Sequence, residues 1–540
     1  MPKSDRWPGA VRLILFSSLL TLLLYLPTNP APRLAARAAP ARLPPNVVVV
    51  MADDLDDALT QRLLDGGHLP HIRTFVRDEG TWFRNAYVTV SLCCPSRATF
   101  LTGQYAHNHG VLGNDLPSGS VALLDDSSTL ATWLQDSGYA VGHVGKYLNR
   151  YASSPQAPTG SPLNPFYVPP GYDYWRGLTK TYIMYDYEVN EDGALVPYGT
   201  AVSDYQTDVL AQMAAAFITA QEAADLQPFF LIVTPLAPHI ESEPGAPTIP
   251  GCTHTPWSRT LRPAPRHGSL LATLSLPQPP SFNEADLSDK PPLFQANFPA
   301  MTPEDVACAQ KQYQNRAESM LAVDDLVGTL VTTLQTHGEW DHTVFIFTSD
   351  NGYYVGEHRL YQKVFPYEEG IRVPLLMRVP GTTPGQVVDQ VVLNNDLAPT
   401  IAELAGVTPG LDVDGRSLLP LLHDPALTPW RDAFLVTFQG HLIQFGYFPH
   451  FTAVRSAADY QPAPDQLFVT WEDRTTEHYD LAADPFQLAS RHADPQLAPQ
   501  RRALERLRRQ LLTCSGAACR SAENGIVPFE AYLPFSASSP

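Results

Sequence analysis

Four polar residues each follow a short apolar run in this chain of 540 residues, and their types could act together on a charged group. They are Asp53, Lys146, His239 and Asp350. Short β-branched or apolar runs bounded by polar residues predict buried strands. Ligands of open α/β sheets bind beyond the carboxyl ends of the strands. If the four strands are parallel neighbours, these side chains converge on one site.

Two of these positions also carry a second oxygen donor. Asp54 follows Asp53, and Asn351 follows Asp350. Carboxylate and amide oxygens are hard ligands that suit calcium or magnesium rather than zinc. Taken alone, Asp-Asp after a strand usually caps a helix, and Asp-Asn-Gly usually forms a turn. Their joint presence after two strands favours a metal site.

Six cysteines are present: Cys93, Cys94, Cys252, Cys308, Cys514 and Cys519. Outside the cytosol an even number suggests disulfides. The last two could close a small loop, and the middle two could form a second pair. Cys93 and Cys94 are adjacent, and neighbouring cysteines rarely form an unstrained bridge. They need a different explanation.

The run Cys-Cys-Pro-Ser-Arg begins at Cys93 and is followed by Leu-Thr-Gly at residues 101–103. It resembles the signature of the sulfatase family, Cys-x-Pro-Ser-Arg with a later Leu-Thr-Gly, at complete spacing. The resemblance implies that Cys93 is oxidised to formylglycine and that Cys94 fills the variable position. The alternative is a buried, unmodified cysteine pair that opens a helix.

Formylglycine chemistry would explain the motif. A hydrated aldehyde offers two hydroxyls on one carbon; one attacks the sulfate ester, and the other then loses its proton and expels sulfate. A helix that begins near Pro95 would direct its N–H groups and positive dipole at the anion. Arg97 would hold the hydrate or the metal-bound oxyanion.

The resemblance also implies roles for the residues after the strands. Asp53, Asp54, Asp350 and Asn351 match the family's metal ligands, and the formylglycine oxygen at Cys93 completes a site for one Ca²⁺.

Three further residues match positions that handle the substrate. Lys146 and Lys363 match the sulfate-binding lysines, and His239 matches the histidine near the leaving-group oxygen. Either His239 or Lys363 is the candidate general acid for the leaving alcohol.

One position departs from the family pattern. Many sulfatases have a histidine two residues after the first lysine, as the base that collapses the sulfate intermediate; here it is Leu148. His107 and His109 could contribute, or they could be polar residues that close a helix. The motifs look most like the N-acetylglucosamine-6-sulfatase branch, which acts on heparan and related glycans. This implies a sulfated small molecule or glycan as substrate, and a formylglycine-generating enzyme as maturation partner.

The elements that must position these residues alternate along the chain. Apolar runs at 46–50, 139–144, 229–233, 343–347 and 373–377 are interspersed with helical patterns at 128–137, 204–224 and 310–336. The alternation predicts an α/β fold: a mostly parallel sheet with helices on both faces. The resemblance implies that it is alkaline-phosphatase-like. We expect the catalytic domain to span residues 40–425.

The pattern changes in residues 426–540, the expected C-terminal subdomain and tail. Short runs at 433–438, 441–447, 451–456, 466–471 and 476–479 predict a smaller antiparallel sheet. A basic amphipathic helix is expected at 500–512, followed by an irregular tail from 515.

The first 39 residues are typical of a secretory signal peptide. A basic start precedes an apolar stretch at 13–26 and small residues at 34–39. The stretch is short beside the roughly 20 apolar residues of a membrane span. Secretion, or a periplasmic or cell-surface location, is therefore expected. An uncleaved signal anchor is the alternative, and it would be the chain's one contact with a membrane.

The balance of charge restricts the partners. With 36 basic against 55 acidic residues the formal net charge is −19. Such a chain repels phosphate, so no nucleic-acid partner is expected. It also repels a sulfated polysaccharide at long range, so any anionic substrate must be held by a few local cations.

Two other functions compete with sulfate-ester hydrolysis. A phosphomonoesterase or phosphodiesterase of the wider superfamily would share the sheet and metal site, but usually has a Ser or Thr nucleophile and zinc held by added histidines. A non-catalytic glycan-binding protein of the same fold would keep Cys93 unmodified. The complete motif around Cys93 favours the sulfatase.

Overall fold

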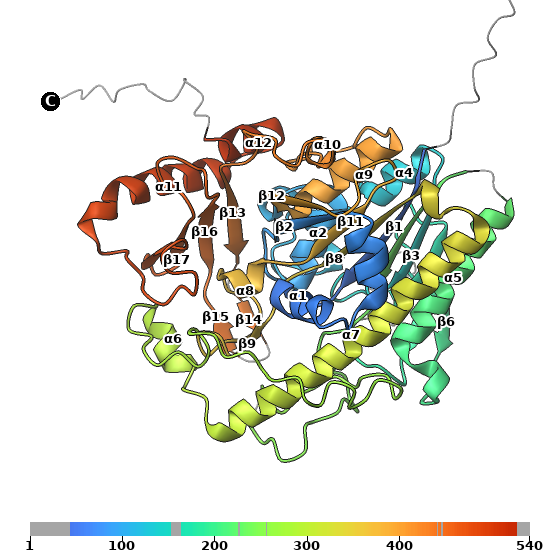
Figure 1. Ribbon diagram of the computed structural model, residues 1–540, viewed down its shortest axis with the longest axis horizontal. Coiled ribbons are helices and arrows are strands. Elements are labelled where there is room, and N and C mark those ends of the chain that lie inside the picture. Colours follow the sequence, from blue (N-terminus) through green and yellow to red (C-terminus); the bar gives the residue numbers. More distant parts are fainter. Residues whose placement is uncertain are drawn as a thin grey trace, which may run out of the picture. The chain divides into compact units, whose positions relative to one another are not determined.

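The centre of the fold is a sheet of ten strands (Figure 1). The computed structural model describes residues 44–525 except 153–163, 225, 226, 255, 440, 444 and 445, so the expected signal peptide lies outside the described residues. From edge to edge the strands are β12 (Gln386–Leu393), β2 (Thr81–Tyr87), β11 (Leu375–Arg378), β8 (Thr343–Ser349), β1 (Asn46–Ala52), β7 (Phe229–Thr234), β3 (Ala140–Gly145), β4 (Tyr174–Leu178), β5 (Glu188–Glu191) and β6 (Ala194–Pro197).

The four strands that precede the candidate residues are neighbours. In the order β8, β1, β7 and β3 they pair in parallel, which confirms the sequence prediction. The run at 373–377 forms β11, but β11 is antiparallel to β8. A parallel return would need a crossover of a dozen or more residues, usually a helix. The connection, residues 350–374, is long enough but contains only a short hairpin and the four-residue helix α8 (Glu368–Ile371), with no long helix to cross the sheet.

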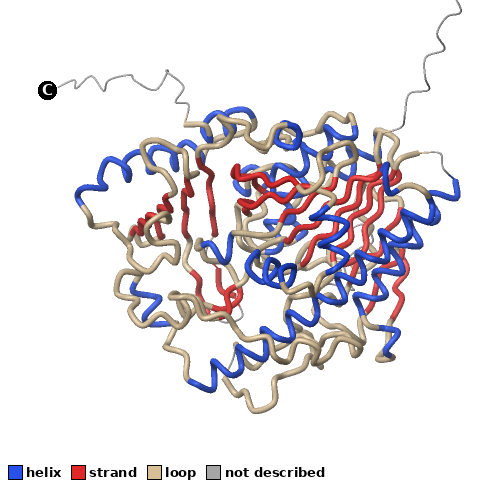
Figure 2. Tube along the Cα trace, viewed as in Figure 1, coloured by secondary structure: helices blue, strands red, loops and turns tan. Residues whose placement is uncertain are grey.

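Helices cover both faces of the sheet, as predicted, and β1 shows why. Its side chains alternate between two apolar layers. Val48 and Val50 face one layer, whereas Val47, Val49 and Met51 face the other. The first layer includes α1 (Asp57–Asp65), α5 (Gln206–Ala224) and α7 (Pro303–His337), and the second includes α2 (Cys93–Thr102), α4 (Leu130–Asp136) and α9 (Leu397–Ala405). Figure 2 shows the strands of this sheet between helices.

The predicted antiparallel sheet is present after residue 425. It contains β13 (Ala433–Phe438), β16 (Phe451–Ser456), β17 (Gln466–Trp471) and β18 (Thr476–Asp480). The single strand predicted at 441–447 is wrong: it is the antiparallel pair β14 (His441–Ile443) and β15 (Gly446–Phe448). Gly446 weakens a continuous strand there. The domain boundary near residue 425 stays a prediction.

The C-terminal helices cover this second sheet. The basic helix appears as α11 (Ala498–Leu511), within two residues of its predicted bounds. The irregular tail predicted from 515 is wrong for α12 (Ala517–Glu523). Disulfides join Cys514 to Cys519 and Cys252 to Cys308. Within the described part of the chain, no helix has the length and apolar character needed to cross a membrane.

Tertiary contacts at Glu523 explain why α12 is ordered. This buried carboxylate accepts hydrogen bonds from Tyr105 Oη and Arg416 Nη2, both at 2.6 Å, and from Arg431 Nε at 2.9 Å. Arg431 also pairs with Asp396, 2.8 Å away. None of these partners is near in sequence, so the composition of the tail alone does not reveal the helix.

We expect Glu523→Gln to lower the free energy of unfolding by about 3 kcal/mol, because two arginines lose a buried countercharge. The measurement is the urea midpoint at unchanged slope. Glu505→Gln, on the surface of α11, is the control and should cost about 0.5 kcal/mol. Equal shifts for the two variants would contradict the buried network.

Candidate active site

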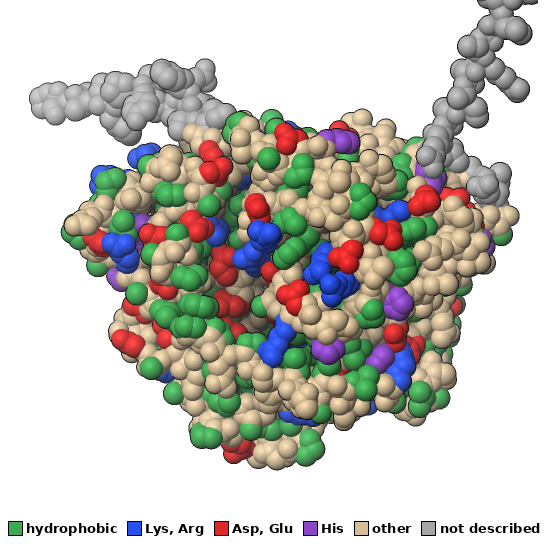
Figure 3. Space-filling model, in the orientation of Figure 1, with side chains coloured by type: hydrophobic (Ala, Val, Ile, Leu, Met, Phe, Trp, Pro, Cys, Tyr) green, Lys and Arg blue, Asp and Glu red, His purple; other side chains and the backbone are tan. Residues whose placement is uncertain are grey.

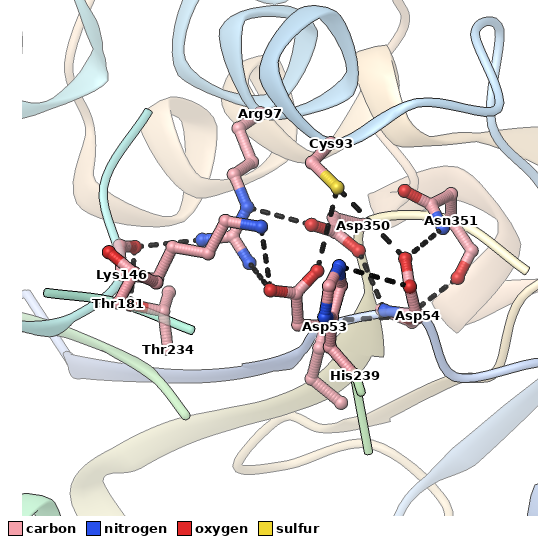
Figure 4. A network of polar contacts seen from close by, with 12 residues as sticks. Asp53, Asp54, Cys93, Arg97, Lys146, Thr181, Thr234, His239, Asp350 and Asn351 are labelled. Atoms are coloured by element: carbon pink, nitrogen blue, oxygen red, sulfur yellow. Dashed lines mark hydrogen bonds and ion pairs between the residues drawn. The ribbon is translucent and has the colours of Figure 1, made fainter. Parts of the chain in front are cut away.

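The structure brings all nine candidate residues to one place beyond the carboxyl ends of the parallel strands, and Figure 4 labels all of them except Lys363. They are Asp53, Asp54, Cys93, Arg97, Lys146, His239, Asp350, Asn351 and Lys363. Cys93 is the first residue of α2, and every residue of that helix is buried. The geometry therefore joins the Cys motif to the loops that follow β1, β3, β7 and β8.

The start of α2 presents Cys93 to the aspartates. Leu92 before it is extended and cannot cap the helix through its own side chain, whereas the N–H of Cys94 donates to Asn114 Oδ1 at 3.0 Å. The helix dipole therefore points its positive end at the site. Cys93 Sγ lies 3.6 Å from Asp53 Oδ1 and 4.0 Å from Asp54 Oδ1. Gly103, at φ 68°, ends the helix in the left-handed conformation that glycine permits.

Each lysine is held by a different aspartate. Lys146 Nζ donates to Asp53 Oδ2 at 2.6 Å, and Lys363 Nζ donates to Asp54 Oδ1. Both lysines are buried. Arg97 is the third cation; its Nε donates to Asp350 Oδ2 at 2.7 Å. The three carboxylates are thus balanced by three cations, so one added divalent cation would give the site a net positive charge for an anionic substrate.

The backbone at Asp54 turns both aspartates toward the site. Asp54 has φ 64°, a left-handed conformation that aspartate tolerates better than most residues. Its N–H donates to Asp350 Oδ1 at 3.1 Å, and Asn351 Nδ2 donates to Asp54 Oδ1 at 2.7 Å. The loops after β1 and β8 are therefore tied together.

Unpaired buried oxygens show that the donor set fits a metal ion. Asp54 Oδ2 and Asn351 Oδ1 are buried with no hydrogen-bond partner among the described residues. Such atoms cost about 1–3 kcal/mol each when left unsatisfied. Ligand atoms of Asp53, Asp54, Cys93 and His239 all lie within 4.8 Å of one another. Two of these four residues are carboxylates, and together with the oxygens of Asp350 and Asn351 they offer the oxygen ligands that calcium and magnesium prefer.

Electrostatics keep the aspartates charged and the thiol neutral. Burial would raise the pKa of Asp53, but Lys146, His239 and Arg97 outweigh it and lower the pKa to about 2. Burial raises the pKa of the Cys93 thiol to about 12. At neutral pH Cys93 is therefore protonated, and an unmodified thiol there is a poor nucleophile.

His239 faces the aspartates through one nitrogen. Its Nε2 lies 3.4 Å from Asp54 Oδ2, and its Nδ1 lies 2.6 Å from the carbonyl oxygen of Ile240. That carbonyl can only accept, so we assign the proton to Nδ1. Burial lowers the pKa of His239 despite the nearby Asp54.

Tyr182 is a member of the site that the sequence did not reveal. Its ring centroid lies 4.8 Å from that of His239 and 4.9 Å from Lys146 Nζ. Its hydroxyl accepts a hydrogen bond from Asn149 Nδ2 at 2.7 Å. It lies between strands β4 and β5, with no motif around it, so neither periodicity nor spacing marked it.

The histidines considered as replacements for the missing base lie elsewhere. Leu148 packs in the apolar layer on the α2 side of the sheet. His109 Nε2 lies 3.0 Å from Thr99 Oγ1, and His107 Nε2 lies 3.0 Å from the carbonyl oxygen of Cys514. Both belong to the short helix α3 (Ala106–His109) and hold it against its neighbours, in keeping with a helix-closing role.

A cleft of about 820 Å³ opens over the site. Cys93, His239, Lys363 and Tyr182 line its floor and wall, and its lining also includes Asp115, Asn149, Arg150, Glu243, Arg259 and Phe448. Charges of both signs thus surround the entrance, and the cleft is large enough for a sugar-sized ligand.

Tyr182→Ala should lower kcat/KM for an aryl sulfate by roughly 10–100-fold, because Lys146 loses a cation–π contact and His239 loses its packing partner. Tyr182→Phe keeps the ring and should stay within about threefold of wild type. Steady-state kinetics would measure both, with Tyr185→Ala as a control outside the cleft. A loss as large for Phe as for Ala would assign the effect to the hydroxyl instead.

Known proteins resemble this chain in sequence and in fold. A profile of the sulfatase family matches residues 45–407, and one described as N-sulphoglucosamine sulphohydrolase, C-terminal, matches residues 356–513. The N-acetylglucosamine-6-sulfatase of Capra hircus is 32% identical over 516 residues, covering 88% of this chain and 85% of that protein.

Two solved structures extend the comparison. One, in complex with its substrate D-glucosamine-2-N,6-O-disulfate, has a TM-score of 0.68 at 23% identity and covers 89% of this chain and 99% of its own. The phosphonate monoester hydrolase of Agrobacterium radiobacter has a TM-score of 0.62 at 22% identity, covering 86% and 94%. At 22–23% sequence identity, these two structures are evidence of a shared fold only. Because the family profile covers most of the chain and the relative aligns over nearly all of it, the chain belongs to the sulfatase family and is a sulfuric ester hydrolase of alkaline-phosphatase-like fold.

Proposed function

We propose that this protein removes sulfate from glucosamine-containing glycans, using a formylglycine derived from Cys93 and one bound Ca²⁺. The observation that carries the proposal is the position of Cys93. It is the first residue of α2, within 4.0 Å of two aspartates that each hold a lysine. That is a place for a nucleophile that attacks an anion.

The metal would be held by oxygen ligands already in place. Asp53, Asp54, Asp350 and Asn351 would bind Ca²⁺, with an oxygen at the modified Cys93 completing the set. Two of their oxygens accept no hydrogen bond from any residue that the structure describes. When bound, Ca²⁺ supplies positive charge that attracts the sulfate and favours a deprotonated hydroxyl.

The chain's own cations would bind and orient the substrate. Lys146 and Lys363 would hold sulfate oxygens once the substrate competes for their protons. Arg97 would keep Asp350 in position through its Nε–H. Lys363, or His239 in its doubly protonated form, would deliver a proton to the leaving-group oxygen; in His239 the donating atom would be Nε2, which faces the site and carries a proton only in the imidazolium form.

The glycan class rests on the relatives and on the cleft. The goat relative is named for N-acetylglucosamine 6-sulfate, and the first solved structure holds a disulfated glucosamine. The cleft over Cys93 can accept such a sugar. Two disulfides suit an oxidising compartment, which supports secretion or a periplasmic or cell-surface location. A formylglycine-generating enzyme would be the maturation partner.

The decisive experiment is mass spectrometry of the tryptic peptide between Arg84 and Arg97. This peptide holds Cys93 and Cys94, so Cys94 serves as an internal thiol reference. After maturation it should take up a single alkyl group and carry an aldehyde at position 93. Two alkyl groups, with tight glycan binding and no turnover, would favour the glycan-binding protein instead.

Comparing the turnover of an aryl sulfate with that of an aryl phosphodiester distinguishes a sulfatase from a phosphodiesterase. We expect a large preference for the sulfate. A large preference for the phosphodiester would overturn the proposed substrate class while leaving the formylglycine result intact.

A further inference from the structure

Helix α11 carries a basic face that the proposed chemistry does not use. Its 14 residues include five arginines and one glutamate. Its apolar face packs on the second sheet through Ala503, Leu504, Leu507 and Leu511, which are buried. The opposite face exposes Arg502, Arg506 and Arg509. Spacings of four and three residues place these three side chains along one side of the helix.

Two of these arginines have no counterion within the described part of the chain. Arg509 and its neighbour Arg508 both pair with Glu505, at 2.8 and 2.7 Å. Neither Arg502 nor Arg506 makes a hydrogen bond or ion pair with any residue that the structure describes. The face from Arg502 to Arg509 is about 10 Å long at 1.5 Å per residue. It is therefore a linear row of positive charge.

The row stands out against the charge of the whole chain. A protein with 55 acidic and 36 basic residues has ample carboxylates to neutralise a surface helix, yet α11 keeps an excess of arginines. In Figure 3 basic side chains appear at the left of the view, where α11 lies in Figure 1. An isolated charged face is ordinarily only solvated. A row with unpaired arginines on a strongly acidic protein instead fits a linear polyanion.

The helix that carries the row is joined to the strand that follows the wall of the catalytic cleft. Arg508 Nη1 donates to Thr452 Oγ1 at 2.7 Å. Thr452 is four residues after Phe448, which lines the cleft. Four residues span at most about 14 Å between Cα atoms. The contact through Arg508 therefore anchors the helix that carries the row to the segment next to the cleft wall.

We propose that Arg502, Arg506 and Arg509 form a second binding surface for a sulfated polysaccharide, distinct from the residues that cleave the ester. The inference deepens the proposed function, because it assigns a polymeric substrate to the same enzyme. Guanidinium groups bind sulfate with paired N–H donors, and several contacts along one chain add through effective concentration. The surface supplies the local cations that a protein of net charge −19 needs to hold such a polymer.

The test measures polymer binding apart from turnover. The full chain with Cys93→Ala, which cannot cleave the polymer, is titrated with heparin from about 0.05 to about 0.2 M salt. Adding Arg502→Ala and Arg506→Ala should weaken binding about tenfold at the lower salt and flatten its salt dependence. The matched control is Arg73→Ala with Arg84→Ala, two arginines that do not line the cleft and lie outside α11; it should bind as tightly as the parent.

In the active protein, Arg502→Ala with Arg506→Ala should raise KM for the polymer about tenfold and leave kcat/KM for a small aryl sulfate within about twofold. Alanine favours the helix, so folding should be retained. Unchanged heparin affinity, or an equal loss in the control, would overturn the proposal. So would arginine-dependent binding to phosphatidylserine vesicles with none to heparin, which would assign the row to a membrane. Absence of aryl-sulfate turnover in wild type would contradict the proposed function. The heparin titration would still test the proposed binding surface on α11, because it does not depend on turnover.

Discussion

Replacing Cys93 with alanine is expected to lower kcat for an aryl sulfate by at least about 10⁴-fold, since the variant has no precursor for the nucleophile. Cys93→Ser should lose nearly as much, because a single hydroxyl cannot expel the sulfate and restore an aldehyde. Initial rates at saturating substrate, from protein made in a host that matures sulfatases, give the measurement.

Cys94 is the matched control for this result. It is equally buried and adjacent in α2, but its side chain packs in the apolar layer. We expect Cys94→Ala to keep kcat within about threefold. Comparable losses in both variants would mean that packing of α2, and not chemistry at position 93, determines activity. Wild-type rates in Cys93→Ala would exclude it as nucleophile.

Removal of metal is expected to lower kcat by about 10³-fold or more, with recovery on adding Ca²⁺. Without the ion, three carboxylates and three cations cancel, and the unpaired oxygens of Asp54 and Asn351 repel the sulfate. The rate before and after dialysis against a chelator measures this.

Stability gives a readout of the ion that is independent of activity. Ca²⁺ at about 100 times its Kd should add about 2.7 kcal/mol to the free energy of unfolding, visible as a rise in Tm. Asp54→Asn should abolish most of that rise, whereas the surface variant Asp389→Asn should not. Full activity in excess chelator, with no metal found by elemental analysis, would contradict the proposed site.

Much of the site could be located from the sequence because the ends of the buried strands can be recognised as the points where apolar runs stop. The valines of β1 and the runs of β3, β7 and β8 are buried on both faces, so they read as continuous apolar segments. Their parallel pairing then places Asp53, Lys146, His239 and Asp350 at one edge. Hydrophobic periodicity does not predict α2, because all of its residues are buried. The cysteine motif did predict this helix, which faces the same edge of the sheet.

Other features depend on contacts that no local pattern encodes. The antiparallel direction of β11 goes with a connection to β8 that contains no long crossover helix. Tyr182 reaches the site from an irregular segment, and α12 is held by Glu523 bonding to Tyr105, Arg416 and Arg431. Each of these features depends on contacts between residues that are far apart in sequence. Local sequence patterns do not predict such contacts.

The burial of α2 determines whether Cys93 can be oxidised before or after the protein folds. No residue of this helix is exposed, and Cys93 retains only 1% of its accessible surface. A second enzyme cannot reach that thiol in the finished fold. If Cys93 is oxidised as we propose, oxidation must occur while this segment of the nascent or newly exported polypeptide is still unfolded. Folding and maturation then compete for the same residue, and the faster α2 is enclosed, the smaller the active fraction of the protein.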